Sequence, residues 1–186
     1  MPFIKTDFPG LLVFEPKVFE DQRGYFYESY NKKRFSGEGV EIDFVQDNQA
    51  RSSFGVIRGL HFQMEQHAQT KLLRVLSGEI IDAVVDIRKN SPTYGKAYTI
   101  LLSAENKKQL LVPKGFAHGY SVISETAEVF YKCDEFYYKE TEGGILWNDP
   151  SLEIDWRIPA DKAIISEKDN KLPLLKDCNH NFVFKG

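Results

Sequence analysis

The sequence has little of what marks several large classes of protein. Its 186 residues contain two cysteines and four histidines. The opening residues lack the charged and apolar stretches of a secretory signal, and no apolar run approaches the length of a membrane span. Cys133 and Cys178 could pair in principle, but nothing suggests export, and cytosolic thiols stay reduced. We therefore expect a cytoplasmic protein with two free thiols and no contact with a membrane.

Strong charge of one sign is also missing. The formal net charge is -3 and the isoelectric point is about 5.8, which gives no overall attraction for nucleic acid. Any anionic ligand must therefore be held by a local cluster of basic side chains. The 42% hydrophobic and 27% charged content is typical of a folded chain. This length suits one compact domain, which we expect over residues 1–186.

Helical signal is sparse, whereas strand signal is abundant. Aromatic residues make up 13% of the chain, and short apolar runs are broken by Gly, Pro, Asn and Asp. In the clearest strand, residues 79–88, one face is apolar and the other alternates Asp82 and Asp86 with aliphatic residues. The other predicted strands span residues 11–16, 24–30, 44–50, 56–63, 71–76, 97–103, 109–112, 121–122 and 127–134.

Short helical turns are expected at residues 31–35, 104–108 and 159–165. About ten strands with so little helix indicate an all-β sandwich or barrel. The segment from Asp149 onward has more proline and less alternation, so we expect it to wrap around the barrel.

His61 has the most suggestive neighbours of the four histidines. Arg58 precedes it by three positions, and Gly59 between them could form a bulge that turns both side chains to one face. Lys71 follows on the next predicted strand, with the parity of its inward-facing neighbours. An inward ammonium needs an anion or a chemical use, although it could instead reach the rim. His67 and His180 resemble ordinary surface or core residues.

His118 ends the stretch VPKGFAH, in which proline and glycine predict a tight turn before a strand. This pattern is the second half of the cupin signature, whose histidine often binds metal. In the first half, however, Gln63 stands where a second histidine is required. A metal site would need His61, His118 and Glu65 together, so we favour a site without metal.

Tyr131 shares its parity with small apolar residues of its predicted strand, so its phenol should point inward. It could be a core tyrosine bonded to the backbone, or an acid that faces His61 across a cavity. The charged quartet at 166–169 is ordinarily solvated surface. The remaining polar candidates, none diagnostic alone, are Arg23, Glu28, Gln46, Asn48 and Glu142.

Together these segments resemble the dTDP-4-dehydrorhamnose 3,5-epimerase family. The matching motifs occur in the family's order across nearly the whole chain: DQRGYFYES (21–29), FVQDNQARSSFGVIRGLHFQ (44–63), KLLRVLSGEIIDAVVDIR (71–88), LLVPKGFAHGYSV (110–122), EVFYKC (128–133), WNDPSLEIDW (147–156) and SEKD (166–169). The resemblance implies a metal-free, cupin-type jelly-roll barrel with a few short helices. It also implies a homodimer with exchanged edge strands and no cofactor, consistent with the absence of a dinucleotide-binding fingerprint.

The implied reaction converts dTDP-4-dehydro-6-deoxy-D-glucose to dTDP-4-dehydro-L-rhamnose, in dTDP-L-rhamnose biosynthesis. By motif, His61 is the general base, Asp169 its orienting partner, Tyr131 the acid on the opposite face and Lys71 the group that steadies the enolate. The positions expected to bind substrate are Arg23, Glu28, Gln46, Asn48, Arg58, Lys71, His118, Glu142 and Lys168.

Three alternatives stay open at the level of sequence. The first is an enzyme that epimerises C3 or C5 alone, or a related keto-sugar isomerase. The second is a metal-dependent cupin oxygenase or isomerase, and the third is a non-catalytic sugar-binding jelly roll. Tyr137 is the alternative donor of the second proton. Residues 134–138 also differ from typical family members, which leaves nucleotide stacking undefined.

Overall fold

The computed structural model describes residues 3–186 and confirms the all-β prediction. The strands are β1 (Phe3–Lys5), β2 (Leu12–Phe14), β3 (Phe19–Asp21), β4 (Gly24–Phe26), β5 (Gln46–Ser53), β6 (Ile57–Gln63), β7 (Lys71–Ser77), β8 (Glu79–Asp86), β9 (Ala97–Ser103), β10 (Gln109–Val112), β11 (Phe116–Val122), β12 (Thr126–Cys133) and β13 (Glu142–Gly144). The helical elements are α1 (Lys32–Ser36) and the 3-10 turns Glu65–His67, Lys139–Thr141, Ala160–Lys162, Asp169–Lys171 and Leu175–Asp177. None of these described helices is long and apolar enough to cross a membrane.

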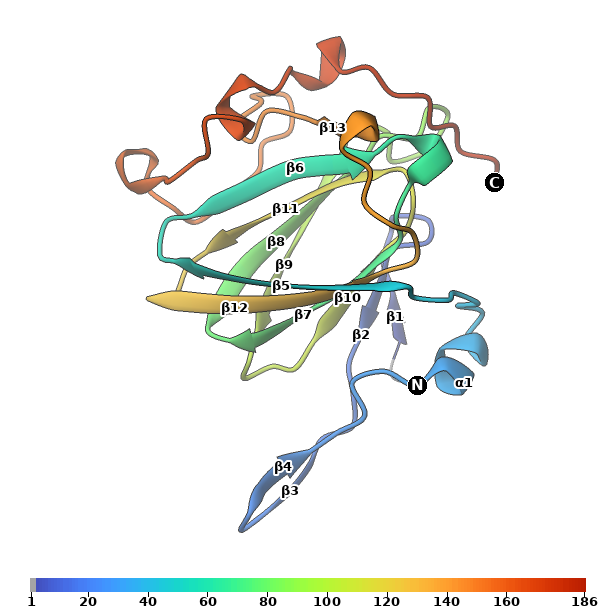
Figure 1. Ribbon diagram of the computed structural model, residues 1–186, viewed down its shortest axis with the longest axis vertical. Coiled ribbons are helices and arrows are strands. Elements are labelled where there is room, and N and C mark those ends of the chain that lie inside the picture. Colours follow the sequence, from blue (N-terminus) through green and yellow to red (C-terminus); the bar gives the residue numbers. More distant parts are fainter. Residues whose placement is uncertain (1–2) are drawn as a thin grey trace.

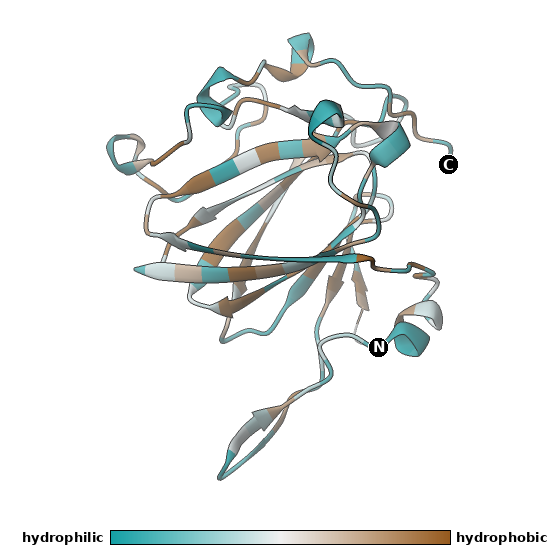
Figure 2. Ribbon diagram, viewed as in Figure 1, coloured by the Kyte–Doolittle hydropathy of each residue, from teal (hydrophilic) through white to brown (hydrophobic). Residues whose placement is uncertain are grey.

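Two antiparallel sheets face each other and form the jelly-roll barrel (Figure 1). One has the order β1-β2-β10-β7-β12-β5, and the other has the order β13-β6-β11-β8-β9. The main core lies between them, where Leu73 and Val129 of the first sheet meet Val84 and Val122 of the second. Apolar residues are interspersed with polar ones along β6 and β12, as strands that border both a core and a polar cavity require (Figure 2).

The C-terminal segment covers the outer face of the second sheet, as predicted. Leu152, Trp156 and Phe182 are buried there against Val85 and other apolar side chains of that face. This explains why both faces of β8 are apolar enough to be buried: one faces the lumen of the barrel and the other faces this segment.

Residues 159–165 are helical only at Ala160–Lys162, so that helix prediction was too long. Ile164 instead continues the sheet beside the start of β6: its amide donates to the oxygen of Gly55 at 2.8 Å, and its oxygen accepts from Ile57 at 3.1 Å. The helix predicted at 104–108 is also wrong. That stretch is a turn, because the side chain of Asn106 bonds to the backbone of residues 101, 103 and 108 and so replaces helical hydrogen bonds.

Two strand boundaries differ from the predicted ones by more than three residues. The strand expected at 121–122 begins at Phe116, so His118 lies within β11 and not before it. The strand expected at 24–30 ends at Phe26, and β3 and β4 form a hairpin that projects from the barrel (Figure 1). Phe19, Tyr25 and Phe26 are exposed on this hairpin.

Asp86 is a fully buried carboxylate whose partners surround it. The guanidinium of Arg88 donates to both of its oxygens at 2.9 and 2.7 Å, and the hydroxyls of Ser91 and Thr93 donate at 2.6 and 2.7 Å. The same guanidinium lies 4.4 Å from the ring centroid of Phe116. The network ties the end of β8 to the following loop and to β11.

We expect Asp86→Asn to lower the free energy of unfolding by about 3 kcal/mol at pH 7, because Arg88 loses its buried counter-charge. Burial alone would raise the pKa of Asp86, but the bonds from Arg88, Ser91 and Thr93 hold that pKa below its ordinary value. A group whose pKa is lowered by folding stabilises the protein above its ordinary pKa, about 4, and this contribution is lost as the pH falls. Urea unfolding should therefore show a difference between wild type and variant that shrinks below about pH 4. A difference independent of pH would contradict this account.

Candidate active site

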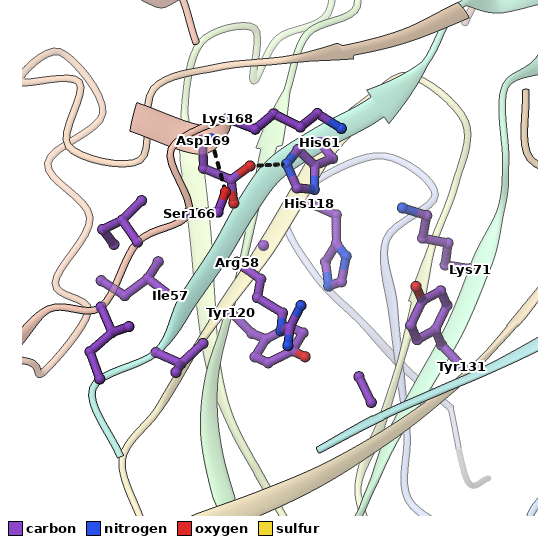
Figure 3. A pocket seen from close by; sticks show the side chains of 15 residues that line it. Ile57, Arg58, His61, Lys71, His118, Tyr120, Tyr131, Ser166, Lys168 and Asp169 are labelled. Carbon is purple, nitrogen blue, oxygen red and sulfur yellow. Dashed lines mark hydrogen bonds and ion pairs between the residues drawn. The ribbon is translucent and has the colours of Figure 1, made fainter. Parts of the chain in front are cut away.

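A cavity of about 550 Å³ lies inside the barrel between the two sheets (Figure 3). His61, Lys71 and Tyr131 line it, and the same three side chains line an adjoining pocket of about 140 Å³. Arg58, His118, Lys168 and Asp169 also line the larger cavity, together with the hydroxyl-bearing Tyr120 and Ser166. Gln46, Asn48, Tyr137 and Glu142 belong to the smaller pocket. The three shared side chains therefore stand where the two spaces meet.

The backbone of β6 bulges at Gly59 and turns Arg58 and His61 toward the cavity, as predicted. The pairing with β11 shifts register at this point. Gly59 has a φ of +120°, and a Cβ added there would lie 2.6 Å from the Cα of Gly119. Only glycine fits both the conformation and the close approach of the two strands.

Asp169 holds His61 from behind. Its Oδ1 lies 2.7 Å from Nε2 of His61, and its Oδ2 accepts from the amide of Gly59 at 3.2 Å. Because a carboxylate only accepts, this bond requires the proton of His61 on Nε2 and leaves Nδ1 as a free base. Burial would raise the pKa of Asp169, but the bonds from His61 and Gly59 outweigh it and leave the pKa lowered.

The expectation that 166–169 is solvated surface is wrong for Asp169, which is buried. Its backbone amide donates to the hydroxyl of Ser166 at 3.0 Å, and this bond starts the turn that carries the carboxylate inward. The extended residues before Ser166 lie along β6, so one segment delivers Asp169 to the histidine of that strand.

Tyr131 and Lys71 come from the sheet opposite His61, on β12 and β7. Burial raises the pKa of Tyr131 to about 12, so its phenol stays protonated. Its hydroxyl has no hydrogen-bond partner in the described part of the chain, so the alternative of a core tyrosine bonded to the backbone is wrong. The ammonium of Lys71 lies 5.9 Å from the centroid of that ring. Lys71 lines both pockets, so its side chain points into the barrel and not to the rim, and burial lowers its pKa.

His118 of β11 pairs directly with His61 of β6 in the sheet. Its Nε2 lies 2.9 Å from Oδ2 of Asp82, a residue that the sequence did not single out as functional. The sequence did contain a sign that Asp82 is functional: it is a carboxylate on the lumen-facing side of β8, between the apolar residues Ile80 and Val84.

Gln63 occupies the position where the cupin signature has a metal-binding histidine. Its side-chain oxygen accepts from the amide of Tyr138 and from the hydroxyl of Thr141, both at 3.0 Å. It thereby anchors the loop after β12. The side chain of Glu65, the third ligand that a metal site would need, lies outside the described part of the structure.

The mouth of the smaller pocket is a hydrogen-bonded network centred on Glu142. One of its oxygens accepts from Lys168 at 2.5 Å and from the hydroxyl of Tyr137 at 2.8 Å. On the other side, Gln46 donates to Asn48 at 3.0 Å. Tyr137 is thus half-exposed and bound to a carboxylate, whereas Tyr131 faces the interior.

Two of the predicted binding residues lie outside both pockets. Arg23, in the β3–β4 hairpin, forms an exposed ion pair with Asp21 at 2.6 Å. Glu28 accepts from the side chains of Asn31 and Arg34 near α1. Within a single chain the hairpin projects away from the barrel, so the structure does not bring these residues to the cavity.

Of the two remaining histidines, His67 differs from expectation and His180 is the core residue that was one of its two expected states. His67 is not simply solvated: its ring stacks on Tyr138 with centroids 3.8 Å apart. His180 is buried against Phe62 and Phe182, and burial lowers its pKa.

Comparisons with known proteins agree on one family. A family model described as dTDP-4-dehydrorhamnose 3,5-epimerase matches residues 5–177. The chain is 53% identical over 170 residues to the dTDP-4-dehydrorhamnose 3,5-epimerase of Shigella flexneri, covering 91% of this chain and 93% of that one.

Solved structures show the same likeness. The crystal structure of dTDP-4-dehydrorhamnose 3,5-epimerase from Elizabethkingia anophelis matches with a TM-score of 0.90 and 54% identity, covering 94% of this chain and 96% of that one. The Legionella pneumophila epimerase in complex with dTDP-4-keto-L-rhamnose matches with a TM-score of 0.90 and 46% identity, covering 94% and 93%. A double mutant of a 3'-monoepimerase from Streptomyces bikiniensis, in complex with dTDP, matches with a TM-score of 0.86 and 27% identity, covering 92% of this chain and 86% of that one.

Proposed function

Because the chain belongs to the dTDP-4-dehydrorhamnose 3,5-epimerase family, we propose that its barrel cavity binds dTDP-4-dehydro-6-deoxy-D-glucose and inverts C3 and C5 to give dTDP-4-dehydro-L-rhamnose. The enzyme is an isomerase, and this step belongs to dTDP-L-rhamnose biosynthesis. The observation that carries the residue roles is the opposition of His61, backed by Asp169, to Tyr131 of the facing sheet.

The chemistry follows from the ketone of the substrate. A carbonyl at C4 acidifies the hydrogens on C3 and C5. Nδ1 of His61 takes one of these protons, and the electron pair of the C–H bond moves into an enolate whose charge rests on O4. Lys71 supplies the positive charge that stabilises this oxyanion inside a cavity where solvent does not screen it.

Inversion requires that the new proton arrive on the face opposite to His61. Tyr131 is the phenol on that side, and its raised pKa keeps it protonated until the enolate carbon takes the proton. His61 then releases its proton to solvent and the phenolate of Tyr131 takes one up, and repetition of the sequence at the second carbon gives the double epimerisation. Asp169 keeps the proton of neutral His61 on Nε2 and stabilises the imidazolium that forms in each cycle.

Binding of the anionic nucleotide needs local positive charge in a chain of net charge -3. Arg58 and Lys168 line the cavity and supply it. We assign Gln46, Asn48, Glu142 and His118 to substrate contacts in the same two pockets.

Arg23 and Glu28 become part of this proposal through a homodimer. The hairpin that carries Arg23 projects from the barrel with aromatic side chains exposed, as an arm that reaches another subunit would. We propose that this arm is exchanged between two copies and brings both residues to the partner's cavity. We also propose that the enzyme works in the cytoplasm, where its two free thiols stay reduced.

Incubation with the keto sugar in D2O tests the reaction. We expect proton NMR to show deuterium at both C3 and C5 of the product, because both hydrogens are acidified by one ketone and pass through one base. Deuterium at a single centre would show a monoepimerase, as in the Streptomyces relative. No uptake at either centre, with dTDP still bound in calorimetry, would indicate a binding protein.

Retention of activity after chelation is a second expected result. The roles above need only side chains of this chain, so treatment with EDTA followed by desalting should leave kcat unchanged. Loss of turnover that returns with one added divalent metal would support the metal-dependent alternative.

A further inference from the structure

The lumen of the barrel holds a second histidine–carboxylate pair, His118 with Asp82, beside the pair that contains His61. Asp82 lies on β8 and shares its lumen-facing side with Ile80 and Val84. Its Oδ2 is 2.9 Å from Nε2 of His118, and its exposed fraction is 0%. A carboxylate buried so completely destabilises a fold unless its charge is paired. Its place in the lumen therefore points to a task other than stability.

Asp86, four residues along the same strand, shows what a structural buried carboxylate looks like in this protein. Both of its oxygens accept hydrogen bonds, from Arg88, Ser91 and Thr93. Asp82 has a bond at one oxygen only. Its Oδ1 is buried and has no hydrogen-bond partner among the described residues. Such an unpartnered oxygen is unusual for a group that serves only the fold.

Asp82 also lies near Lys71, the residue proposed to stabilise the enolate. Burial lowers the pKa of Lys71, and the carboxylates of Asp82 and Glu142 are among the groups that oppose this shift. Lys71 forms no ion pair within the described part of the chain, so Asp82 is a nearby anion without direct contact. Tyr120, which pairs with Asp82 across β8 and β11, carries another buried oxygen that has no hydrogen-bond partner among the described residues.

The two histidine pairs differ in their access to water. The side chain of His61 is 29% exposed, whereas that of His118 is 7% exposed and that of Asp82 is 0% exposed. A base that removes substrate protons must exchange them with solvent between turnovers, and His61 can do so. His118 is enclosed, which suits a group that holds a fixed orientation.

We propose that Asp82 is a positioning residue, which holds the proton of His118 on Nε2 and balances the charge of Lys71 inside the barrel. Nδ1 of His118 is then fixed as an acceptor for a hydroxyl of the sugar. The ammonium of Lys71 remains charged for the enolate oxygen. This inference rests on the proposed function, because it assigns Asp82 to the same reaction.

Histidine NMR tests the tautomer without any measurement of activity. In the 15N-labelled protein, the signals of His118 are identified by their loss in His118→Gln. We expect the wild-type His118 to carry its proton on Nε2, and Asp82→Asn to move population toward the Nδ1 tautomer, since an amide can donate to Nε2. A wild-type His118 with its proton on Nδ1 would overturn the proposal even if the variant did not fold.

Kinetics separate positioning from stability. We expect Asp82→Asn to lower kcat by about 10- to 100-fold while KM changes by less than about threefold, because the affected interactions strengthen in the transition state. The matched control is Asp86→Asn, assayed below its melting temperature. It should melt earlier than wild type yet keep wild-type kcat.

A folded Asp82→Asn with wild-type kcat would overturn the inference. Equal losses of kcat in Asp82→Asn and Asp86→Asn would do the same, since they would show a general effect of buried charge. Failure of the proposed function looks different: the wild-type protein itself would then take up no deuterium from D2O.

Discussion

His61→Asn should fold, bind dTDP and lose turnover by about 10²- to 10⁴-fold, the range expected when a general base is removed. The amide has nearly the size of the imidazole and can still bond to Asp169, so the fold and the nucleotide contacts should persist. Only the lone pair that takes the proton from C3 and C5 is lost. Calorimetry with dTDP and a coupled assay of product formation measure the two properties separately.

His67→Asn is the matched control, because it makes the same substitution at a histidine that stacks on Tyr138 outside the larger cavity. It should keep wild-type kcat. Asp169→Asn should also lower kcat strongly, because an amide can favour the wrong tautomer of His61. If His61→Asn retained full activity while Asp169→Asn did not, the base would have to lie elsewhere in the cavity.

The local part of the site could be predicted from sequence because it depends on strand parity. Alternation along β7 and β12 places Lys71 and Tyr131 toward the lumen, whatever partners these strands have. Gly59 between Arg58 and His61 likewise marks a bulge that needs no knowledge of the rest of the fold. Such features are set by neighbours in the chain, and the structure shows all of them.

The missing parts depend on contacts between distant segments. Asp82 meets His118 only because β8 pairs with β11 in one register, which strand patterns alone do not give. Ile164 joins the edge near β6 through two backbone hydrogen bonds, to Gly55 and Ile57, which lie 109 and 107 positions earlier in the sequence. Its own sequence is equally compatible with a helix.

The arm shows a further limit of local reasoning. Arg23 and Glu28 match binding positions of the family by motif, yet the single chain leaves both outside the cavity. A sequence motif points to the role that a residue has in the assembled dimer. The fold of a single chain shows only where that residue lies relative to its own barrel. The two agree if the arm is exchanged, as proposed above.

Tyr131→Phe should separate deprotonation from inversion, and this is the second large effect that we expect. Without the phenol, His61 still removes the proton from the substrate, but the enolate can regain one only from the same face. Product formation should fall by about 10²- to 10⁴-fold. In D2O, the recovered substrate should nevertheless gain deuterium at the acidified carbons, because partly exposed His61 exchanges its proton with solvent between removal and return.

Tyr137→Phe is the comparison, since Tyr137 is the alternative donor. Its hydroxyl donates to Glu142 at the mouth of the smaller pocket, so its loss should change KM more than kcat and leave inversion intact. If Tyr137→Phe instead showed exchange without inversion while Tyr131→Phe turned over normally, the two phenols would have to trade roles. The pH profile gives an independent check. With a pKa of about 12, Tyr131 should cause no alkaline loss of rate at any pH below about 11. A loss of rate near pH 9 that disappears in Tyr131→Phe would contradict the assignment of Tyr131 as a fully protonated acid.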